Sequence, residues 1–358
     1  MDKLQTLYGL NDVTLIPERL TNIKHRSECD PHHEINGWKV LPIFASPMSC
    51  IINEDNWKTF EMNGILPIIP RNIPLQTRYK LTTKTFVAYG IDEFKEFIEF
   101  HKGRYFDNNG VSCDKYFVCI DIANGHMRCL YELCKEAKET FKDNISIMTG
   151  NIANPETYLE IASFKCVDYI RIGIGSGNVC TTSANTAIHY PMASLIMECK
   201  KIKDNGWQFP EYKFPDIVAD GGFKNFDQII KALALGADWV MTGQIFAKSD
   251  AACGKVHKRI NWKEIIQFNF KKSFKYYREY YGMSTKKAQK EFGGEGKKTA
   301  EGIVKLVEIE YTLHGWVDNF MSFLKSAMSY TNCKTLQEFI GGPKVGLMTN
   351  TAYISYFK

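Results

Sequence analysis

The sequence has no long hydrophobic run, no strong excess of one charge, and no internal repeat or low-complexity block. No apolar stretch reaches the ~18 residues of a transmembrane helix, so we expect no membrane partner. The 45 basic and 40 acidic residues give a formal net charge of only +5, which is typical of an ordinary mixed surface. Because there is also no arginine-rich arm and no zinc-finger spacing, we expect no nucleic-acid partner.

The eleven cysteines form neither a disulfide framework nor a metal site that can be identified from their spacing. Their number is odd, they are scattered along the chain, and no secretory signal precedes them. Pairs such as Cys129 and Cys134 lack histidine partners at the spacing of a metal site. We therefore expect a cytoplasmic protein with reduced thiols.

Apolar residues make up 44% of the 358 positions, which is enough for one large core or for a barrel with insertions. They occur in short runs that are apolar on both faces, as in parallel strands covered by helices. The strands expected from these runs are Val40–Ser46, Ile65–Ile69, Phe86–Ala88, Tyr116–Asp121, Ile145–Thr149, Tyr169–Ile172, Ile217–Ala219 and Trp239–Thr242. The helices expected between them are Glu93–His101, His126–Phe141, one starting at Asn154, Ala187–Lys203 and Phe226–Leu235.

This alternation predicts an α/β fold, a (β/α)8 TIM barrel that residues 1–358 form as a single domain. A doubly wound sheet is the alternative, but no strand is followed by a GxGxxG motif that opens a helix. Beyond the barrel strands, polar glycine-rich sequence predicts a mobile flap at about 268–302. An apolar helix at about 317–330 is expected to close the barrel.

The strongest candidate for chemistry is the loop after the sixth expected strand, Gly-Ile-Gly-Ser-Gly-Asn-Val-Cys-Thr-Thr at residues 173–182. Active sites of such barrels lie on the loops that follow the strands. Cys180, surrounded by glycine-rich polar chain, is a candidate nucleophile, and Thr182 is a candidate proton relay. Glu301, beyond the flap, is a candidate acid or base. The alternative is an ordinary strand-to-helix turn in which Cys180 is inert.

Other loops carry candidate ligand sites. Asp220-Gly221-Gly222 and Gly243-Gln244 follow the seventh and eighth strands, whose loops commonly bind a phosphate through backbone N–H groups. The alternative for Asp-Gly-Gly is a tight turn without a ligand. The carbonyl groups of Gly175, Gly177 and Cys180 are candidates for holding a monovalent cation.

Several segments together resemble one family of (β/α)8 barrels. The most specific are residues 173–182, Val218-Ala-Asp-Gly-Gly222 and Lys231-Ala-Leu-Ala-Leu-Gly-Ala237, and the likeness runs from Leu10 to about Tyr330. On these segments the chain resembles the IMP dehydrogenase and GMP reductase family. Within that family, residues 120–125 and 281–285 are similar to the reductases. No pair of regulatory CBS modules interrupts the barrel, whereas most of the dehydrogenases carry one.

The resemblance implies an NADPH-dependent oxidoreductase that deaminates GMP reductively to IMP and releases ammonia, a step of purine salvage. Cys180 would attack C2 of the purine, and Thr182 and Glu301 would protonate the departing amine. Hydride from the nicotinamide would then convert the covalent thioimidate to IMP. The resemblance also implies a homotetramer, and it allows a bound potassium ion.

The resemblance assigns binding residues one by one. Those for the substrate are Asp220, Gly221, Gly222, Gly243, Gln244, Gly282, Met283, Ser284, Lys298 and Gly302. Those for the cofactor are His25, Arg26, Arg71, Asp121, Ile122, Ala123, Ile174, Gly175, Ser326, Ala327, Met328 and Ser329, the last four from a neighbouring subunit. Arg26 and Arg71 would suit a 2′-phosphate, because a guanidinium group matches phosphate in a bidentate geometry.

Three alternatives remain open from the sequence. An IMP dehydrogenase without CBS modules is one, although residues 293–300 lack the Arg-Tyr pair with which its flap activates water. A catalytically silent nucleotide-binding barrel is another, and an intact Cys180 argues against it because a binder needs no nucleophile. A reductase that acts on a modified guanine nucleotide is the third.

Overall fold

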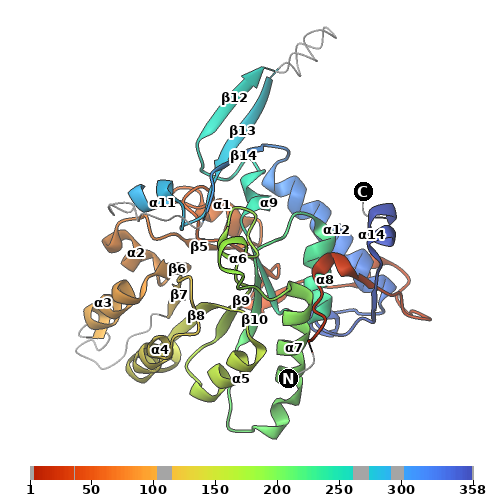
Figure 1. Cartoon of the computed structure of the whole chain (residues 1–358), viewed down its shortest axis with the longest axis horizontal. Coiled ribbons are helices and arrows are strands. Elements are labelled where there is room, and N and C mark those ends of the chain that lie inside the picture. The colour runs from red at the N-terminus through yellow and green to blue at the C-terminus, as the bar shows by residue number, and fades with distance from the viewer. Residues whose placement is uncertain (1–3, 36, 103–114, 261–273, 292–301, 357–358) are drawn as a thin grey trace.

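The computed structural model describes residues 4–35, 37–102, 115–260, 274–291 and 302–356. Eight parallel strands close into a barrel in which β11 pairs with β4, and helices surround it (Figure 1). The strands are β4 (Ile43–Ala45), β5 (Leu66–Ile69), β6 (Phe86–Tyr89), β7 (Tyr116–Ile120), β8 (Ile145–Ile152), β9 (Tyr169–Ile172), β10 (Asp216–Asp220) and β11 (Trp239–Thr242). The expected (β/α)8 barrel is therefore confirmed, and each expected strand is present.

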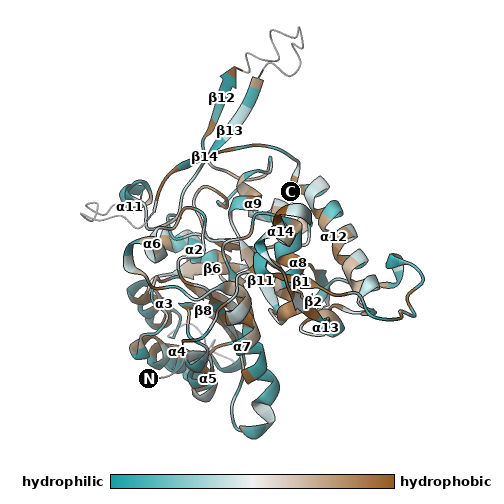
Figure 2. Ribbon diagram, turned by 45° about the vertical axis from the view of Figure 1, so that its right-hand side comes forward, coloured by the Kyte–Doolittle hydropathy of each residue, from teal (hydrophilic) through white to brown (hydrophobic). Residues whose placement is uncertain are grey.

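Helices follow the strands and cover the outside of the barrel. Among the described helices, those of ten or more residues are α3 (Ile91–Lys102), α4 (Arg128–Phe141), α5 (Pro155–Phe164), α7 (Met192–Asp204), α8 (Phe226–Leu235) and α12 (Leu313–Tyr330). The shorter ones are α1 (Trp57–Met62), α2 (Leu75–Leu81), α6 (Thr182–Thr186), α9 (Gln244–Ala247), α11 (Lys286–Glu291), α13 (Leu336–Phe339) and α14 (Asn350–Tyr356). Hydrophilic and hydrophobic residues alternate along α3, α4 and α5, as expected for helices with one face on the barrel (Figure 2).

Local signals set the ends of these helices. Asn154 caps α5 as expected, because its Oδ1 accepts a hydrogen bond of 2.7 Å from the backbone N–H two residues on. The single helix expected over 187–203 was wrong at its start, since Ala187 has φ of +59° and α7 begins only at Met192. Pro191 has no N–H to donate and favours extended backbone in the residue before it, so the helix cannot continue through it.

The interior of the barrel is packed with large side chains. The Phe44 ring centroid lies 5.5 Å from that of Phe86 and 5.1 Å from that of Trp239, and Met148 and Met241 are fully buried beside them. A second apolar cluster fills the space between strands and helices. Because alternate residues of a strand point to opposite faces, both clusters draw on the same strands. This explains why the strands are continuous apolar runs in the sequence.

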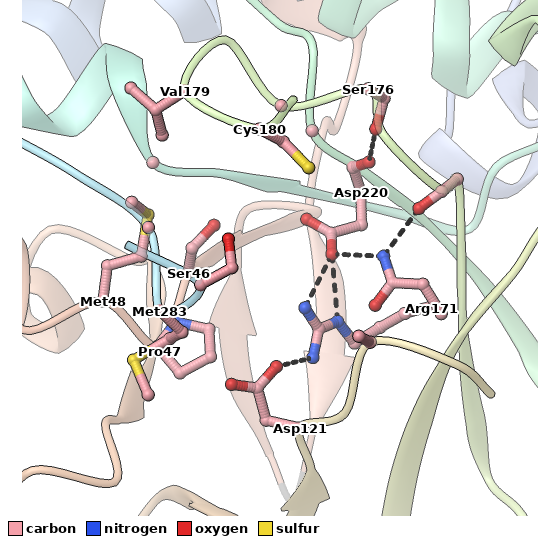
Figure 3. Close-up of a pocket in the computed structure, with 18 of the residues that line it drawn as sticks. Ser46, Pro47, Met48, Asp121, Arg171, Ser176, Val179, Cys180, Asp220 and Met283 are labelled. Carbon is pink, nitrogen blue, oxygen red and sulfur yellow. Dashed lines mark hydrogen bonds and ion pairs between the residues drawn. The ribbon is translucent and has the colours of Figure 1, made fainter. Parts of the chain in front are cut away.

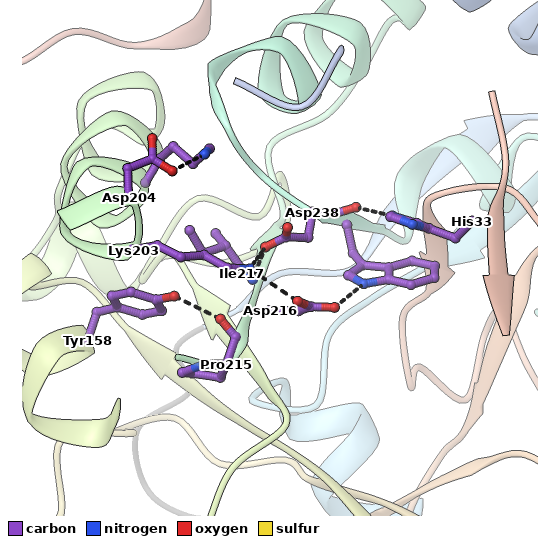
Figure 4. Close-up of polar contacts among 10 residues, drawn as sticks. His33, Tyr158, Lys203, Asp204, Pro215, Asp216, Ile217 and Asp238 are labelled. Atoms are coloured by element: carbon purple, nitrogen blue, oxygen red, sulfur yellow. Dashed lines mark hydrogen bonds and ion pairs between the residues drawn. The ribbon is translucent and has the colours of Figure 1, made fainter. Parts of the chain in front are cut away.

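An ion cluster closes the end of the barrel at which β10 and β11 begin (Figure 4). The Nζ of Lys203 on α7 lies 3.1 Å from Oδ1 of Asp216 and 2.8 Å from Oδ2 of Asp238. The same Asp238 oxygen accepts a 2.7 Å hydrogen bond from the Ile217 N–H, and the Trp239 indole donates to Asp216 at 3.1 Å. These contacts fix α7 to the starts of two strands.

At the other end of the barrel, β12 (Val256–Ile260), β13 (Phe274–Tyr280) and β14 (Lys305–Glu308) form an antiparallel sheet that projects away from it (Figure 1). Within the flap expected at about 268–302, the described residues comprise β13, α11, the segment between them and Gly302. The helix expected at about 317–330 is α12, which begins four residues earlier because Thr312 caps it.

Two pairs of short antiparallel strands lie outside the barrel. Strand β1 (Val13–Leu15) pairs with β15 (Val345–Leu347) and so joins the N-terminal and C-terminal parts of the chain. Strand β2 (His33–Ile35) pairs with β3 (Trp38–Val40), its neighbour in sequence. None of the helices in the described part of the chain is long and apolar enough to cross a membrane.

Candidate active site

A cavity of about 920 Å³ lies at the end of the barrel where the strands terminate. The loops after β4, β7, β9, β10 and β11 line it, together with Tyr280 and Gly282–Ser284 from the start of the flap. This is the end at which (β/α)8 barrels carry their chemistry. The volume is ample for a nucleotide and part of a second ligand.

The loop after β9 owes its shape to glycine. Gly173 and Gly175 have φ of +114° and +71°, a region that side chains disfavour. A Cβ atom on Gly173 would lie 2.6 Å from the Cε of Met192 and 2.9 Å from the Asp220 carbonyl oxygen. The loop is therefore folded tightly against the end of β10, and this close approach aims the residues after it into the cavity.

Cys180 is half-buried, and its side chain points into the cavity (Figure 3). Its Sγ donates a hydrogen bond of 3.2 Å to the Oγ1 of Thr182. Buried thiols elsewhere are kept protonated, since burial raises the pKa of Cys50 and of Cys119 to about 12. Cys180 thus combines access to the cavity with an adjacent hydroxyl, which suits a nucleophile.

The chain that follows the flap returns along the Cys180 loop. Gly302 forms an antiparallel β-bridge with Cys180, and the Ile303 N–H donates to the Val179 carbonyl at 3.0 Å. Two residues on, the Lys305 ammonium donates to the Asn178 carbonyl at 2.6 Å. The predicted site residues Glu301 and Lys298 lie outside the described residues. Gly302, the last residue of the expected flap, is the described residue that pairs with Cys180.

The two loops expected to bind phosphate both line the cavity. Gly221 and Gly222 have φ of +87° and +86°. A Cβ atom on Gly221 would meet the Ser176 hydroxyl at 2.8 Å, and one on Gly243 would meet the Met48 sulfur at 2.6 Å. Glycine therefore keeps the chain close to its neighbours at these places, and the Gly221 N–H itself donates to the Met241 carbonyl at 3.2 Å.

A charged network that the sequence did not reveal lies beside these loops (Figure 3). The Arg171 guanidinium, from β9, pairs with Asp121 at 2.6 Å and with Asp220 at 2.7 Å. Asn151 donates a further 2.7 Å hydrogen bond to Asp220. A signal existed, because an arginine inside the apolar strand Tyr169–Ile172 must find counter-charges. Its partners could not be named from their distance in sequence.

The residues expected to bind the cofactor fall into two groups. Those that line the cavity are Arg71, Asp121, Ile122, Ala123, Ile174 and Gly175. Those that do not are His25, Arg26, Ser326, Ala327, Met328 and Ser329. The second group is itself contiguous, since Nη1 of Arg26 donates to Oγ of Ser326 at 3.3 Å. In the first group, the Nε of Arg71 donates to Glu93 at 2.8 Å, which fixes the guanidinium at the cavity wall.

The expected cation ligands were tested against the hydrogen bonds of the loop. The Gly175 carbonyl accepts from the Ser183 hydroxyl at 3.1 Å, and the Gly177 carbonyl accepts from the Cys180 N–H at 3.0 Å. Each of these two carbonyl oxygens thus accepts one hydrogen bond from the chain and keeps a second lone pair. Among the described residues, no group of three or more His, Cys, Asp or Glu side chains is placed to hold a metal ion either.

Comparison with known proteins gives a consistent result. A family model described as "IMP dehydrogenase / GMP reductase domain" matches residues 107–355. A GMP reductase of Caenorhabditis elegans is 28% identical over 376 aligned positions, which cover 96% of this chain and 94% of the relative. GMP reductases of Vibrio vulnificus (strain YJ016) and Buchnera aphidicola subsp. Schizaphis graminum are 27% and 28% identical, each covering 92% of this chain and 91% of the relative. The range matched by the family model includes the Cys180 loop and both glycine-bearing loops.

Proposed function

The chain belongs to the IMP dehydrogenase / GMP reductase family, and we propose that it is an NADPH-dependent oxidoreductase that converts GMP to IMP and releases ammonia. The observation that carries the proposal is the position of Cys180, with its Sγ 3.2 Å from Thr182 Oγ1. Both residues line a cavity whose wall also contains Asp220–Gly222 and Gly243. The names of the similar proteins in worm and bacteria favour the reductase within the family.

In the proposed reaction Cys180 acts as nucleophile toward C2 of the guanine. Its proton passes toward Thr182, which already accepts a hydrogen bond from the thiol, and the sulfur–C2 bond forms. Protonation of the 2-amino group by Thr182 and Glu301 lets it leave as ammonia, because an unprotonated amine is a poor leaving group. A thioimidate remains, in which C2 is bonded to sulfur and is open to reduction.

NADPH, when bound, supplies a hydride for C2. The sulfur–C2 bond then breaks and returns the thiolate, so that the net reaction consumes GMP, NADPH and two protons and yields IMP, NADP⁺ and ammonium. In this second half of the reaction, the role of the protein is to hold C2 beside the nicotinamide and to exclude water. Access of water matters, because hydrolysis of the thioimidate would release a 2-oxo purine nucleotide instead of IMP, which is the outcome in the dehydrogenases.

The remaining walls bind the nucleotide. The Asp220 carboxylate accepts hydrogen bonds from ribose hydroxyls, and the backbone N–H groups of Gly222, Gly243 and Gln244 donate to the phosphate. Gly221, whose N–H donates to the Met241 carbonyl, shapes the turn that brings the phosphate loop close to its ligand. Gly282, Met283 and Ser284 close over the nucleotide from the start of the flap, and Lys298 and Gly302 do so from its end. A monovalent cation such as potassium belongs to the proposal at the carbonyl groups of Gly175, Gly177 and Cys180, because a carbonyl oxygen that accepts one hydrogen bond keeps a second lone pair for a cation.

Two groups of residues would hold the cofactor. Arg71, residues 121–123, Ile174 and Gly175 would hold its nicotinamide half, while His25, Arg26 and Ser326–Ser329 of an adjacent subunit would hold the other half. The separation of these two groups within one chain supports this arrangement. We accordingly propose a homotetramer that acts in the cytoplasm.

The proposed function is tested by mixing the purified protein with GMP and NADPH, and separately with IMP and NAD⁺, while following absorbance at the nicotinamide band. We expect loss of reduced cofactor with GMP and no gain with IMP. Formation of reduced cofactor with IMP would instead identify an IMP dehydrogenase without CBS modules. Binding without turnover in either mixture would identify a silent nucleotide-binding barrel. Assays with a panel of modified guanine nucleotides would show whether the substrate is one of these instead of GMP.

A substitution in the phosphate loop gives a second prediction. Gly221→Ala places a Cβ 2.8 Å from the Ser176 hydroxyl and 3.2 Å from the Gly177 nitrogen, at a φ of +87°. We expect KM for GMP to rise about tenfold or more, because ~1.4 kcal/mol of lost phosphate contact already gives that factor. KM for NADPH should change less.

Gly37→Ala is the matched control. Gly37 also has a positive φ, +80°, but a Cβ there meets no atom within 4 Å. It therefore imposes similar backbone strain without touching the cavity. Equal KM values for GMP in the two variants would remove Gly221 from the phosphate site.

A further inference from the structure

One guanidinium group links two carboxylates on opposite sides of the cavity floor (Figure 3). Arg171 is 7% exposed and lies in β9, while Asp121 follows β7 and Asp220 ends β10. Its Nη1 donates to Asp121 Oδ1 at 2.6 Å, and its Nη2 and Nε donate to Asp220 Oδ2 at 2.7 and 3.0 Å. Contacts this short to a planar group leave neither aspartate free to move alone.

At each of the two carboxylates, only one of the two oxygens accepts hydrogen bonds from the residues that the structure describes. All the donors to the Asp220 side chain, including Asn151 at 2.7 Å, converge on Oδ2. Asp121 likewise uses Oδ1. Within the described part of the chain, no hydrogen bond reaches Asp220 Oδ1 or Asp121 Oδ2, and both residues line the cavity. Each carboxylate therefore keeps one acceptor oxygen for a ligand.

The two free oxygens face different ligands of the proposed reaction. Asp220 stands next to the phosphate-loop glycines, where the ribose of the nucleotide would lie. Asp121 adjoins Ile122 and Ala123 on the wall assigned to the nicotinamide half of the cofactor. Burial alone would lower the pKa of Arg171, but the two aspartates raise it far above its ordinary value, so the guanidinium stays charged.

We propose that Arg171 is a positioning residue that couples the nucleotide and cofactor subsites. By holding Oδ2 of Asp220 and Oδ1 of Asp121 at once, it sets the direction of both free oxygens. A nucleotide that fixes Asp220 therefore also fixes Asp121, and GMP tightens the binding of NADPH by the same factor as NADPH tightens that of GMP. This inference rests on the proposed function for the identity of the two ligands.

The test measures binding in a Cys180→Ala background, where no turnover consumes the ligands. NADPH is titrated by its fluorescence with and without saturating GMP, and the ratio of the two dissociation constants is the coupling factor. We expect at least about fivefold coupling, the lower end of typical values. Adding Arg171→Lys keeps one positive charge but cannot bridge both carboxylates, so the factor should fall to about one while both ligands still bind.

A second variant tests the coupling independently of Arg171, in case the Arg171→Lys protein does not fold. Asp121→Ala removes the acceptor of the Arg171 Nη1 hydrogen bond and leaves Arg171 bonded to Asp220, so it should abolish coupling and weaken NADPH while leaving the dissociation constant of GMP within about twofold. Thermal unfolding of each variant shows whether it is folded. Absence of coupling in Cys180→Ala alone, or coupling that persists in a folded Arg171→Lys or Asp121→Ala variant, overturns the inference. The turnover assay with GMP and NADPH decides the proposed function separately, because the coupling is judged on binding alone.

Discussion

Replacing Cys180 with alanine is expected to lower turnover of GMP by about 10³-fold or more, with the dissociation constant of GMP changed by less than about threefold. The reason is that the thiol forms a bond to C2 and makes few of the ground-state contacts. The phosphate loops and Asp220, which supply most of the proposed contacts to the nucleotide, are not altered by the change. Initial rates of NADPH oxidation and calorimetric titration of GMP measure the two quantities.

The control is Cys129→Ala, since Cys129 is an exposed cysteine of α4 outside the cavity. Its turnover should equal that of the unchanged protein. Mass spectrometry of protein mixed with IMP and NADP⁺ should also find an adduct on the peptide that contains Cys180. Normal turnover in Cys180→Ala, or an adduct on another cysteine, would falsify the proposed chemistry.

The largest expected effect on stability is that of Lys203→Met, which should reduce the free energy of unfolding by about 3–5 kcal/mol at neutral pH. The substitution conserves much of the side-chain volume but leaves Asp216 and Asp238 facing each other without the ammonium that lies 3.1 and 2.8 Å from them. The Asp238 side chain is only 11% exposed, so water cannot replace the lost partner. Urea unfolding followed by fluorescence measures the change.

The destabilisation should shrink as the pH falls. Burial already raises the pKa of Asp238 above its ordinary value in the presence of Lys203, and loss of the ammonium raises it further. A carboxyl whose pKa is higher in the folded state stabilises the fold when protonated, and that contribution is lost as the pH rises through the folded-state value. The free energy of unfolding of Lys203→Met should therefore be closest to that of the unchanged protein at a pH near the ordinary aspartate pKa. The difference between the two proteins should grow as the pH rises above that value.

Lys201→Met provides the matched control, because Lys201 is an exposed residue of the same helix. It should change the free energy of unfolding by about 0.5 kcal/mol or less. If Lys203→Met is no less stable than Lys201→Met, the cluster shown in Figure 4 does not hold α7 to the barrel.

Much of the candidate site was open to prediction because it is local in sequence. Cys180 and Thr182 are two residues apart, and a loop that follows a buried strand must emerge at the same end of the barrel as the other such loops. The same reasoning placed Asp220–Gly222 and Gly243 at the cavity. Neither the glycine spacing nor the strand order, however, could show which side chains meet across the cavity floor.

The Arg171 network illustrates the limit. The guanidinium meets its two carboxylates across 50 and 49 residues of chain, and either aspartate could have been an isolated loop residue. Likewise, Arg26 and Ser326 meet across 300 residues, and the sequence predicted both as cofactor residues without showing that they are in contact. Such pairs form only when the sheet closes, since β9 must first lie between β8 and β10.

The sequence by itself determined the eight strands, the start of α5 at Asn154, and the glycine-rich loop that carries the candidate nucleophile Cys180. These depend on interactions over a few residues: side-chain alternation, capping, and the backbone freedom of glycine. Tertiary structure alone decided that α7 packs onto an ion cluster, that the chain after the flap pairs with the Cys180 loop, and that one arginine serves two aspartates. The physical reason is that a buried charge selects its partners by distance in space, and only barrel closure sets those distances.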